Sequence, residues 1–262
     1  MATDKMISRT AGAIGHVIFN NPEKHNAVSL EMWDATDAIL AEFEADEAVR
    51  VVVLSGAGGK SFVSGADISK FEKERGSEEA VRHYNSRTRA VYERIQAFPK
   101  PTIAMINGYC IGGGLNLAVT CDLRFCSRKS RFAMPAARLA LGYPYPAIKR
   151  LIDVVGQGAA KDLMYSARRI DADEALRVGL VQQIVEEPDL EGFVDEYAGR
   201  IAGNAPMTVR AMKYIAGEVF KDPADRDLEE CDRRVAACFA SEDYKEGARA
   251  FMEKRDPQFG GR

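Results

Sequence analysis

Two uninterrupted apolar runs constrain the fold of this chain more than any other feature. They are VRVVVLSG (49–56) and TIAMINGY (102–109), and both include a glycine near their end. A run without alternating polar residues is typical of a strand buried on both faces, as in a parallel sheet. A charged helical pattern over about 77–97 separates them. Strand, helix and strand in this order predict an α/β core with parallel pairing.

The pattern extends toward both ends of the chain. AIGHVIFN (13–20) predicts a strand, and Ser29 is suited to cap the helix that follows. CDLRFC (121–126) predicts a further strand, and GLVQQIV (179–185) predicts the last one. Beyond it we expect helices over 190–203, 207–220, 225–240 and 243–254. A chain of 262 residues suits one large domain, or one core with a smaller appendage.

Composition excludes several classes of function. Hydrophobic residues make up 46% of the chain and charged residues 29%, as in ordinary globular proteins. The formal net charge of −3 gives no long-range attraction to nucleic acid or to an anionic membrane. The N-terminus has no apolar leader, and no stretch reaches the roughly 18 apolar residues of a membrane span. We therefore expect a cytoplasmic protein with neither nucleic-acid nor membrane partners.

The cysteines and histidines argue against a disulfide framework and against a metal centre. The chain has five cysteines, an odd number, and all stand in apolar surroundings, which favours buried free thiols. It has three histidines and neither an HExxH nor a CxxC motif. A zinc site built by the protein is therefore not expected.

Two glycine-rich loops suggest nucleotide binding, but their spacing does not support it. GAGGKS (56–61) ends like a phosphate-binding loop, yet Leu54 stands where that motif needs its first glycine. Residues 108–114 follow the pattern GxxxGGG and not the GxGxxG of dinucleotide-binding turns.

A different function uses both loops together. SGAD (64–67) and IGGG (111–114) each follow a predicted strand, and the second opens a short predicted helix ending near Thr120. Glycine permits close approach, and a helix N-terminus favours negative charge, so each loop can aim one backbone N–H at the same oxygen. Two such donors form an oxyanion hole, where losing one donor costs about 2.7–4 kcal/mol of transition-state stabilisation. The alternative is that the glycines only permit tight turns.

One further pattern runs almost from end to end. Its segments are NPEKHNAVS (21–29), GKSFVSGADI (59–68), KPTIAMINGYCIGGGLNLAVTCDLR (100–124), RFAMPAARLALG (131–142), ARRIDADEALRVGLVQQIV (167–185) and SEDYKEGARAFMEKRDPQF (241–259). In this order and spacing they resemble the crotonases, the enoyl-CoA hydratase/isomerase superfamily. The resemblance implies an α/β fold with a crotonase-like core of stacked ββα units, wound as a spiral, and a C-terminal helical region. We expect the acyl-CoA-binding core over 1–195 and a helical oligomerisation or lid region over 196–262.

The resemblance also implies a ligand and its contacts. The ligand is an acyl-CoA thioester, with coenzyme A as part of the substrate and no tightly bound cofactor. The oxyanion-hole amides fall on Ala66 and Gly113. The CoA groove is expected to contain Lys24, His25, Ser64, Gly65, Asp67 and Ile68. Lys254 is either a contact to a CoA phosphate, given from a neighbouring subunit, or part of a solvated helix face; the expected assembly is a homotrimer or a dimer of trimers.

The chain departs from the hydratases of this family at both acid–base positions. Those hydratases use two glutamates to hold and activate water, and here the positions are occupied by Asn116 and Ala136. The stretch 123–152 contains no aspartate or glutamate, so no shift of the alignment supplies one there. Some relatives use bound bicarbonate where the second glutamate is absent, which is a further alternative.

Other residues near the predicted site leave alternatives open. Tyr143 falls where the methylmalonyl-CoA decarboxylases of this family carry a tyrosine, and it or Tyr145 is either a phenol over the acyl group or a packing aromatic. Arg138 either pairs with a substrate carboxylate or forms a structural ion pair. His83 either walls the acyl site or is an exposed helical residue. Asp122 is expected to be structural, and Asn116 either meets the substrate or packs.

The residues and the resemblance together leave three functions open. The leading one is an acyl-CoA enzyme of the enoyl-CoA hydratase/isomerase family that stabilises a thioester enolate, and hydratase is the activity by which such a chain is usually labelled. The second is an acyl-CoA decarboxylase, or another lyase that needs no carboxylate base. The third is an acyl-CoA-binding protein without turnover.

Overall fold

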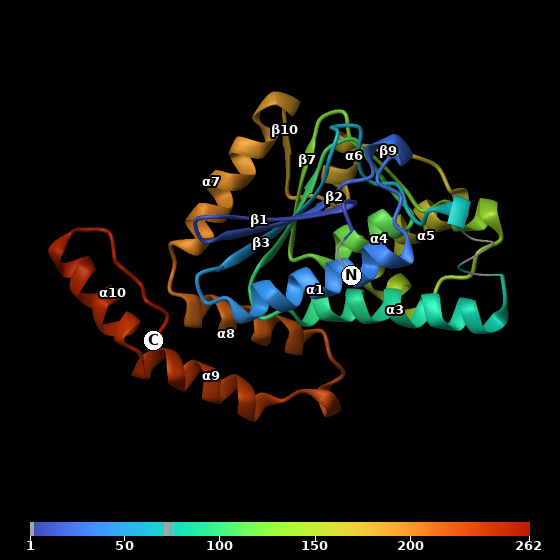
Figure 1. Ribbon diagram of the computed structural model, residues 1–262. Helices are drawn as coiled ribbons and strands as arrows, with labels where there is room; N and C mark the ends of the chain where they lie inside the picture. Colours follow the sequence, from blue (N-terminus) through green and yellow to red (C-terminus); the bar gives the residue numbers. More distant parts are fainter. Residues whose placement is uncertain (1–2, 71–73, 75) are drawn as a thin grey trace.

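The strands form two sheets in the computed structural model, which describes residues 3–70, 74 and 76–262, and the strands between residues 51 and 133 alternate between these sheets (Figure 1). The larger sheet has the order β1 (Met6–Ala11), β2 (Ile14–Phe19), β3 (Val51–Gly56), β5 (Thr102–Ile106), β7 (Leu123–Ser127), β10 (Gln183–Val185). The smaller sheet has the order β4 (Ser61–Val63), β6 (Tyr109–Ile111), β8 (Arg131–Ala133), β9 (Ile170–Asp171). The pairs β1–β2 and β8–β9 are antiparallel, and the other pairs are parallel.

Each repeat of the core adds one strand to each sheet and then a helix. The repeats are β3–β4–α3, β5–β6–α4 and β7–β8–α5, where α3 spans Glu78–Ala97, α4 spans Gly113–Thr120 and α5 spans Tyr145–Ser166. This arrangement confirms the predicted α/β fold with a spiral of stacked ββα units. It also places the loops that follow β4 and β6 side by side, because those two strands are paired.

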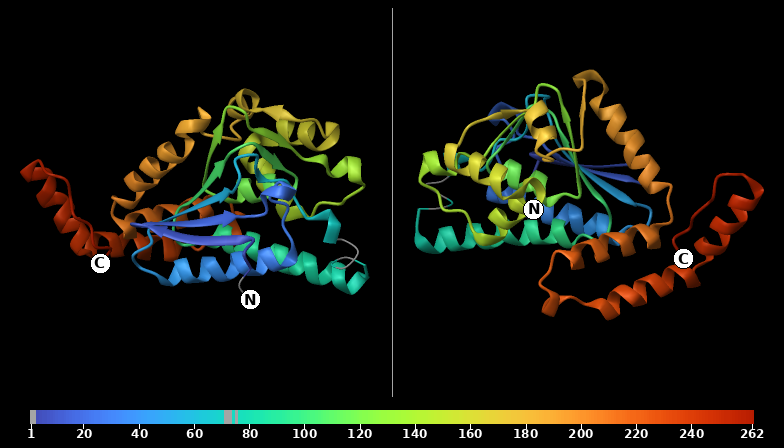
Figure 2. Two further views of the ribbon diagram at one scale, coloured as in Figure 1. Left: turned by 45° about the horizontal axis from the view of Figure 1, so that its top comes forward. Right: turned by 180° about the vertical axis from the view of Figure 1, so that it is seen from behind.

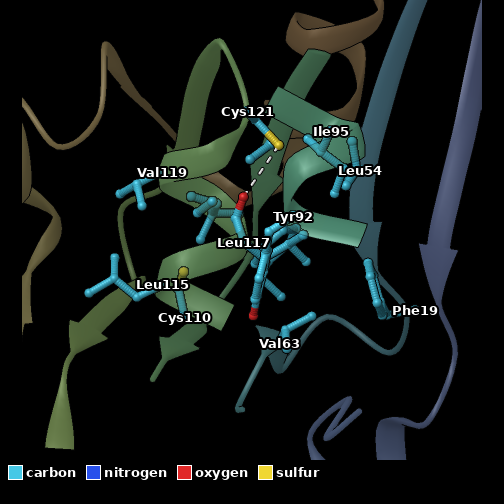
Figure 3. Close-up of a cluster of buried hydrophobic side chains, with 14 of the residues drawn as sticks. Phe19, Leu54, Val63, Tyr92, Ile95, Cys110, Leu115, Leu117, Val119 and Cys121 are labelled. Atoms are coloured by element: carbon cyan, nitrogen blue, oxygen red, sulfur yellow. Dashed lines mark hydrogen bonds between the residues drawn. The ribbon is translucent and has the colours of Figure 1, made fainter. Parts of the chain in front are cut away.

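The core lies on both faces of the larger sheet. On one face pack α1 (Leu30–Ala45), α3 and α4, whose apolar residues join those of the strands in one cluster. Figure 3 shows the part of this cluster that α3 and α4 form with the strands. On the other face packs α7 (Leu190–Ala202), through Leu190, Val194 and Ala198. The run 51–54 of β3 is fully buried, as its uninterrupted apolar sequence predicts.

The last helices extend away from this body. They are α8 (Pro206–Val219), α9 (Leu228–Ala240) and α10 (Glu242–Glu253), and α9 and α10 project well beyond the sheets in both orientations (Figures 1 and 2). Arg50 ties the C-terminal tail back to the core, because its guanidinium donates to the backbone oxygens of Ala202, at 3.0 Å, and Phe259, at 2.7 Å. The division expected between residues 195 and 196 falls inside α7 and stays a prediction.

Several elements differ from the sequence-based expectation. The strands β1 and β4 were not predicted. The run 102–109 is divided between β5 and the start of β6, because the chain turns at Gly108 to enter the smaller sheet. The long helix α5 was also missed, as was the short helix α6 (Ala172–Arg177). Within the described ranges, no helix combines the length and apolar character that a membrane crossing requires.

Candidate active site

A parallel β-bridge joins the loop after β4 to the chain before α1. The Val28 N–H donates to Gly65 O at 2.8 Å, and the Asp67 N–H donates to Val28 O at 3.0 Å. Because successive residues of an extended chain present their backbone groups to opposite sides, the N–H of Ala66 points away from Val28. Gly65 has φ of +110°, a conformation that glycine adopts far more easily than other residues.

The loop after β6 turns directly into α4. Gly112 is the N-cap with φ of +57°, and its N–H donates to Ala133 O at 2.9 Å in β8. Gly113 is the first residue of α4, so its N–H has no partner within the helix. Gly114 must be glycine for a different reason, because a Cβ there would lie 1.9 Å from Val63 O.

These two loops meet at their glycines. A Cβ built on Gly65 would lie 3.7 Å from Gly113 N, and one built on Gly113 would lie 3.6 Å from Gly65 Cα. In the backbone hydrogen bonds recorded between described residues, neither Ala66 N–H nor Gly113 N–H donates to another group. Two uncommitted amides from paired loops, one at a helix N-terminus, are the arrangement that an oxyanion hole requires.

Asn116 lies one turn along α4 from these glycines. Its side chain is 3% exposed, and within the described chain its Oδ1 has no hydrogen-bond partner. The Tyr92 hydroxyl on α3 donates to Gly113 O at 3.1 Å, and the nearby Asn116 amide acts on the pKa of Tyr92 as a hydrogen-bond donor, in the lowering direction. Burial raises the pKa of Tyr92 well above its ordinary value, so the phenol stays protonated. Asn116, which the resemblance predicts to occupy a glutamate position of the hydratases, is therefore a buried polar residue beside the glycine turn.

The segment after β8 closes the site on another side. It forms the 3-10 turn η3 (Pro135–Leu139), which contains Ala136, and then leads to Tyr143. From a Cβ built on Gly112, the Tyr143 hydroxyl would lie at 3.6 Å and Pro135 Cδ at 3.9 Å. The structure therefore brings Tyr143 and Pro135, the residue before Ala136, to the glycine turn, and the roles expected of Ala136 and Tyr143 stay predictions.

The predicted CoA-groove residues are also brought together. Lys24, in the 3-10 turn η1 (Pro22–Lys24), donates to Asp67 Oδ2 at 3.1 Å and to Ser69 Oγ at 2.7 Å. Burial alone would raise the pKa of Asp67, but the hydrogen bonds from Ser69 and Lys24 and the Lys24 charge outweigh it and lower that pKa. The backbone N–H of Ser64 donates to His25 O at 3.2 Å.

Two predicted contacts have a different status. Ile68 begins the 3-10 turn η2 (Ile68–Lys70), and its side chain lies outside the part of the chain that the structure describes. Lys254 is the exposed C-cap of α10, far from α4 within the same chain (Figure 1). A role for Lys254 at this site would therefore require a second copy of the chain.

The remaining candidates sort clearly. Asp122 is structural as expected, because its Oδ2 accepts from the N–H of Thr102 at 2.7 Å and from Lys213 at 2.7 Å. His83 and Tyr145 are exposed. Arg138 is exposed too, and the ion pairs found between described residues include none from it, contrary to the structural pairing considered above.

The structure also tests the expectations about nucleotide binding and about the cysteines. Residues 57–60 turn into the strand β4 and not into a helix, so GAGGKS is not a phosphate-binding loop. All five cysteines are free thiols. The expectation that all are buried was wrong for Cys238, which is half-buried because α9 lies at the surface.

Comparison with known proteins decides the family. The family model described as enoyl-CoA hydratase/isomerase matches residues 9–262. The chain belongs to the enoyl-CoA hydratase/isomerase family. It is 36% identical over 255 residues to a short-chain-enoyl-CoA hydratase of Clostridium acetobutylicum, covering 97% of each chain. It is 36% identical over 263 residues to a crotonyl-CoA hydratase of Syntrophomonas wolfei, covering 99% of each.

Solved structures of this family have the same fold. An enoyl-CoA hydratase of Bacillus anthracis matches with a TM-score of 0.93 and 32% identity, over 99% of this chain and 100% of the other. An enoyl-CoA hydratase/carnithine racemase of Magnetospirillum magneticum matches with a TM-score of 0.92 and 34% identity, over 100% and 97%. The chain is therefore an enzyme of this family with a crotonase fold, and the comparisons leave its particular reaction open.

One functional candidate escaped sequence reasoning. Tyr92 lies on a helix predicted only as charged, and nothing local to it indicates a role beside Gly113. Together with Tyr84, Val91 and Ile95 it forms the buried face of α3, and this helical spacing predicts only that the side chain is buried. Only the packing of α3 against α4 shows where its hydroxyl lies.

Proposed function

We propose that this chain binds the thioester carbonyl of an acyl-CoA between the N–H groups of Ala66 and Gly113. The observation that carries the proposal is the meeting of two uncommitted amides where Gly65 and Gly113 approach each other. Names of curated relatives support the ligand class, since they are given as hydratases of short-chain enoyl-CoA and crotonyl-CoA.

The chemistry follows from this binding mode. An oxygen held by two N–H donors can carry the negative charge of a thioester enolate, because both donors are already oriented toward it. Enolate stabilisation eases removal of an α-proton, addition at the β-carbon, or loss of CO₂. We infer that this shared step, and not one particular reaction, is what the backbone of the site supplies.

The side chains argue against hydration by a pair of glutamates. Asn116 cannot titrate, and Ala136 has no polar group. The absence of aspartate and glutamate from 123–152 leaves that segment without a substitute. Bicarbonate bound near Ala136 is one way in which this family position can be filled, and no tightly held cofactor is needed.

A second candidate reaction is decarboxylation of a malonyl-type acyl-CoA. In that reaction the bond between the α-carbon and the carboxylate breaks, its electron pair forms the enolate, and CO₂ leaves; the α-carbon then takes a proton from solvent. No enzyme base is required. The Tyr143 hydroxyl favours this candidate, because it lies 3.6 Å from the Cβ position of Gly112 and is a hydrogen-bond donor suited to an anionic substrate.

The CoA moiety is proposed to lie along Lys24, His25, Ser64 and Asp67, which share backbone and side-chain hydrogen bonds. Lys254 is proposed to contact a CoA phosphate from a neighbouring copy. Support for such an assembly comes from the large apolar side chains that α8–α10 expose to solvent. They include Met212, Phe220, Phe239, Phe251 and Met252, each more than 60% exposed.

The same helices enclose an apolar groove of about 530 Å³. A surface of this kind is what a homotrimer, or a dimer of trimers, would bury, and this makes residues 196–262 the proposed oligomerisation region. Sedimentation equilibrium measures the assembly directly. A monomer at micromolar concentration would contradict this part of the proposal. A cytoplasmic location remains part of the same proposal.

Mass spectrometry of the products separates the candidate functions. The protein is incubated with crotonyl-CoA and, separately, with methylmalonyl-CoA. Loss of CO₂ from the second substrate supports decarboxylation, and rapid addition of water to the first overturns the argument against hydration. Binding of CoA esters without turnover supports the non-catalytic alternative. No binding of any CoA ester refutes the proposed function altogether.

Restoring the carboxylates tests whether positions 116 and 136 face the substrate. We expect the double variant Asn116→Glu with Ala136→Glu to gain hydratase activity toward crotonyl-CoA, because it supplies the acid–base pair. The matched control is Asn204→Glu with Ala224→Glu, two exposed positions on the C-terminal helices and loops. Equal hydratase activity in the two double variants would mean that residues 116 and 136 do not meet the acyl group.

A further inference from the structure

The hydroxyl of Tyr92 has one proton to donate, and the structure shows where it goes. It is donated to Gly113 O at 3.1 Å. The Tyr92 oxygen can therefore interact with Asn116 only as an acceptor, so the Asn116 amide must turn its NH₂ toward Tyr92. This accounts for the finding that Oδ1, on the other side of the amide, has no partner among the described residues.

The position of that Oδ1 follows from the helix. Residues three and four apart share one face of a helix, so Asn116 lies on the same face as Gly112 and Gly113. Helical side chains lean toward the N-terminus, which directs the Asn116 amide back toward those glycines. Three residues correspond to about 4.5 Å along the axis, which is a short reach from the Gly113 amide.

A buried acceptor without a partner is costly, because it has lost water and gained nothing in return. Asn116 is 3% exposed, so its Oδ1 fits a ligand group that donates a hydrogen bond better than one that accepts. We infer that Tyr92 is a positioning residue that fixes the orientation of the Asn116 amide, so that the site selects acyl groups with a hydroxyl at the β-carbon over those with a carbonyl there.

The inference rests on the proposed function, because it assumes that the thioester oxygen binds at Gly113. The β-carbon is two bonds from the carbonyl carbon, so its substituent then lies beside Asn116. A β-hydroxyl donates to Oδ1, whereas a β-carbonyl places an acceptor against an acceptor. The carboxylate of a malonyl-type ester would do the same, so the inference favours the first candidate reaction over decarboxylation. An amide freed from Tyr92 would be able to turn and present its NH₂ instead, and the preference would be lost or reversed.

The test measures dissociation constants by calorimetry for butyryl-CoA, 3-hydroxybutyryl-CoA and acetoacetyl-CoA, with each ligand checked by mass after the titration. In the unaltered protein we expect 3-hydroxybutyryl-CoA to bind about tenfold more tightly than acetoacetyl-CoA. Tyr92→Phe keeps the aromatic ring, whose centroid lies 5.3 Å from that of Trp33, and removes only the hydroxyl. We expect this variant to reduce the preference to less than about threefold or to reverse it.

Tyr84→Phe is the matched control. Tyr84 is a second buried tyrosine of α3, and its hydroxyl accepts from Trp33 Nε1 at 3.3 Å, away from Gly113. This variant loses a buried hydroxyl from the same helix, but not the one that donates to Gly113 O, so it should keep the tenfold preference. Asn116→Leu should remove the preference because it deletes the acceptor.

The outcomes are distinguishable from failure of the proposed function. Equal binding of the two β-substituted esters by the unaltered protein, with butyryl-CoA also bound, overturns the inference and leaves the proposed function standing. An unchanged preference in Tyr92→Phe also overturns it. Binding of no acyl-CoA at all overturns both.

Discussion

Three glycine-to-alanine substitutions in helices test the oxyanion hole without touching a polar side chain. Gly113 has no positive φ, and a Cβ there would lie 3.5 Å from the Tyr92 hydroxyl and 3.6 Å from Gly65 Cα. These are ordinary contact distances, so Gly113→Ala should fold. The added methyl nevertheless narrows the gap between the two loops, where the thioester oxygen is proposed to enter.

The expected loss can be estimated from the donor that becomes inaccessible. One oxyanion-hole donor contributes about 2.7–4 kcal/mol, which corresponds to a factor of about 10²–10³ in rate. We expect Gly113→Ala to lose activity by about that factor while its melting temperature stays close to that of the unaltered protein. If no substrate is turned over, the ratio of acyl-CoA affinity to CoA affinity replaces the rate, because only the acyl ester has the thioester carbonyl.

Two other helical glycines, one next to Gly113 and one in α7, provide the controls. In Gly114→Ala the new Cβ would lie 1.9 Å from Val63 O, so the backbone must move. We expect the free energy of unfolding to fall by at least about 1–3 kcal/mol, and activity to fall with it. In Gly192→Ala of α7 nothing lies within 4 Å of the new Cβ, so stability should rise by up to about 1 kcal/mol with no change in activity. A Gly113→Ala protein with normal stability and normal activity would refute the placement of the oxyanion hole.

Further predictions concern thiols, pH and helix capping. Burial raises the pKa of Cys121 to about 12, so at pH 8 a thiol reagent should leave Cys121 unmodified in the native protein and label it after unfolding, as peptide mapping would show. Hydrogen bonds from Arg255 and from the backbone lower the pKa of Glu246 to about 2. The stabilisation that these bonds give to α10 is therefore complete above pH 4.5 and is lost as the pH falls toward 2. Hydrogen exchange measures it as the protection factors of the α10 amides, and protection factors that stay constant over this range would contradict the prediction. Lys100, 2% exposed, donates to two backbone oxygens at the end of α1, so Lys100→Met should lower the free energy of unfolding by about 1–3 kcal/mol in urea titrations, and an unchanged midpoint would contradict this.

The parts of the fold that could be predicted from sequence are those set by local pattern. The buried strand β3 follows from its apolar run, and α3 follows from its charged helical pattern over about 77–97. The structure adds the N-cap of α3, where the Ser77 side chain accepts from the N–H of Ala80 at 3.1 Å. The meeting of the two glycine loops was also predictable, because each needs bare backbone after a strand. Their proposed role in catalysis was suggested by residue type and order, and it stays a prediction.

The parts that could not be predicted depend on contacts between distant segments. The helix α5 contains Gly156, whose φ of 75° and ψ of 163° interrupt it, and Pro146 near its start, so its local pattern is broken and only packing sustains it. The strand β4 has three residues, too few for any periodicity. Tyr92 is separated by many residues from Gly113, and its hydroxyl reaches that residue only because α3 and α4 pack together.

The bridge between Val28 and Ala66 has an evolutionary consequence. It fixes one proposed donor entirely through main-chain atoms, as Gly112 does for the other, so neither donor depends on the identity of a reactive side chain. Under the proposed function, substitutions at Asn116 and Ala136 would change the acid–base chemistry while both backbone donors stay in place. Protein engineers could then alter the reaction and the stability of such a chain at separate positions.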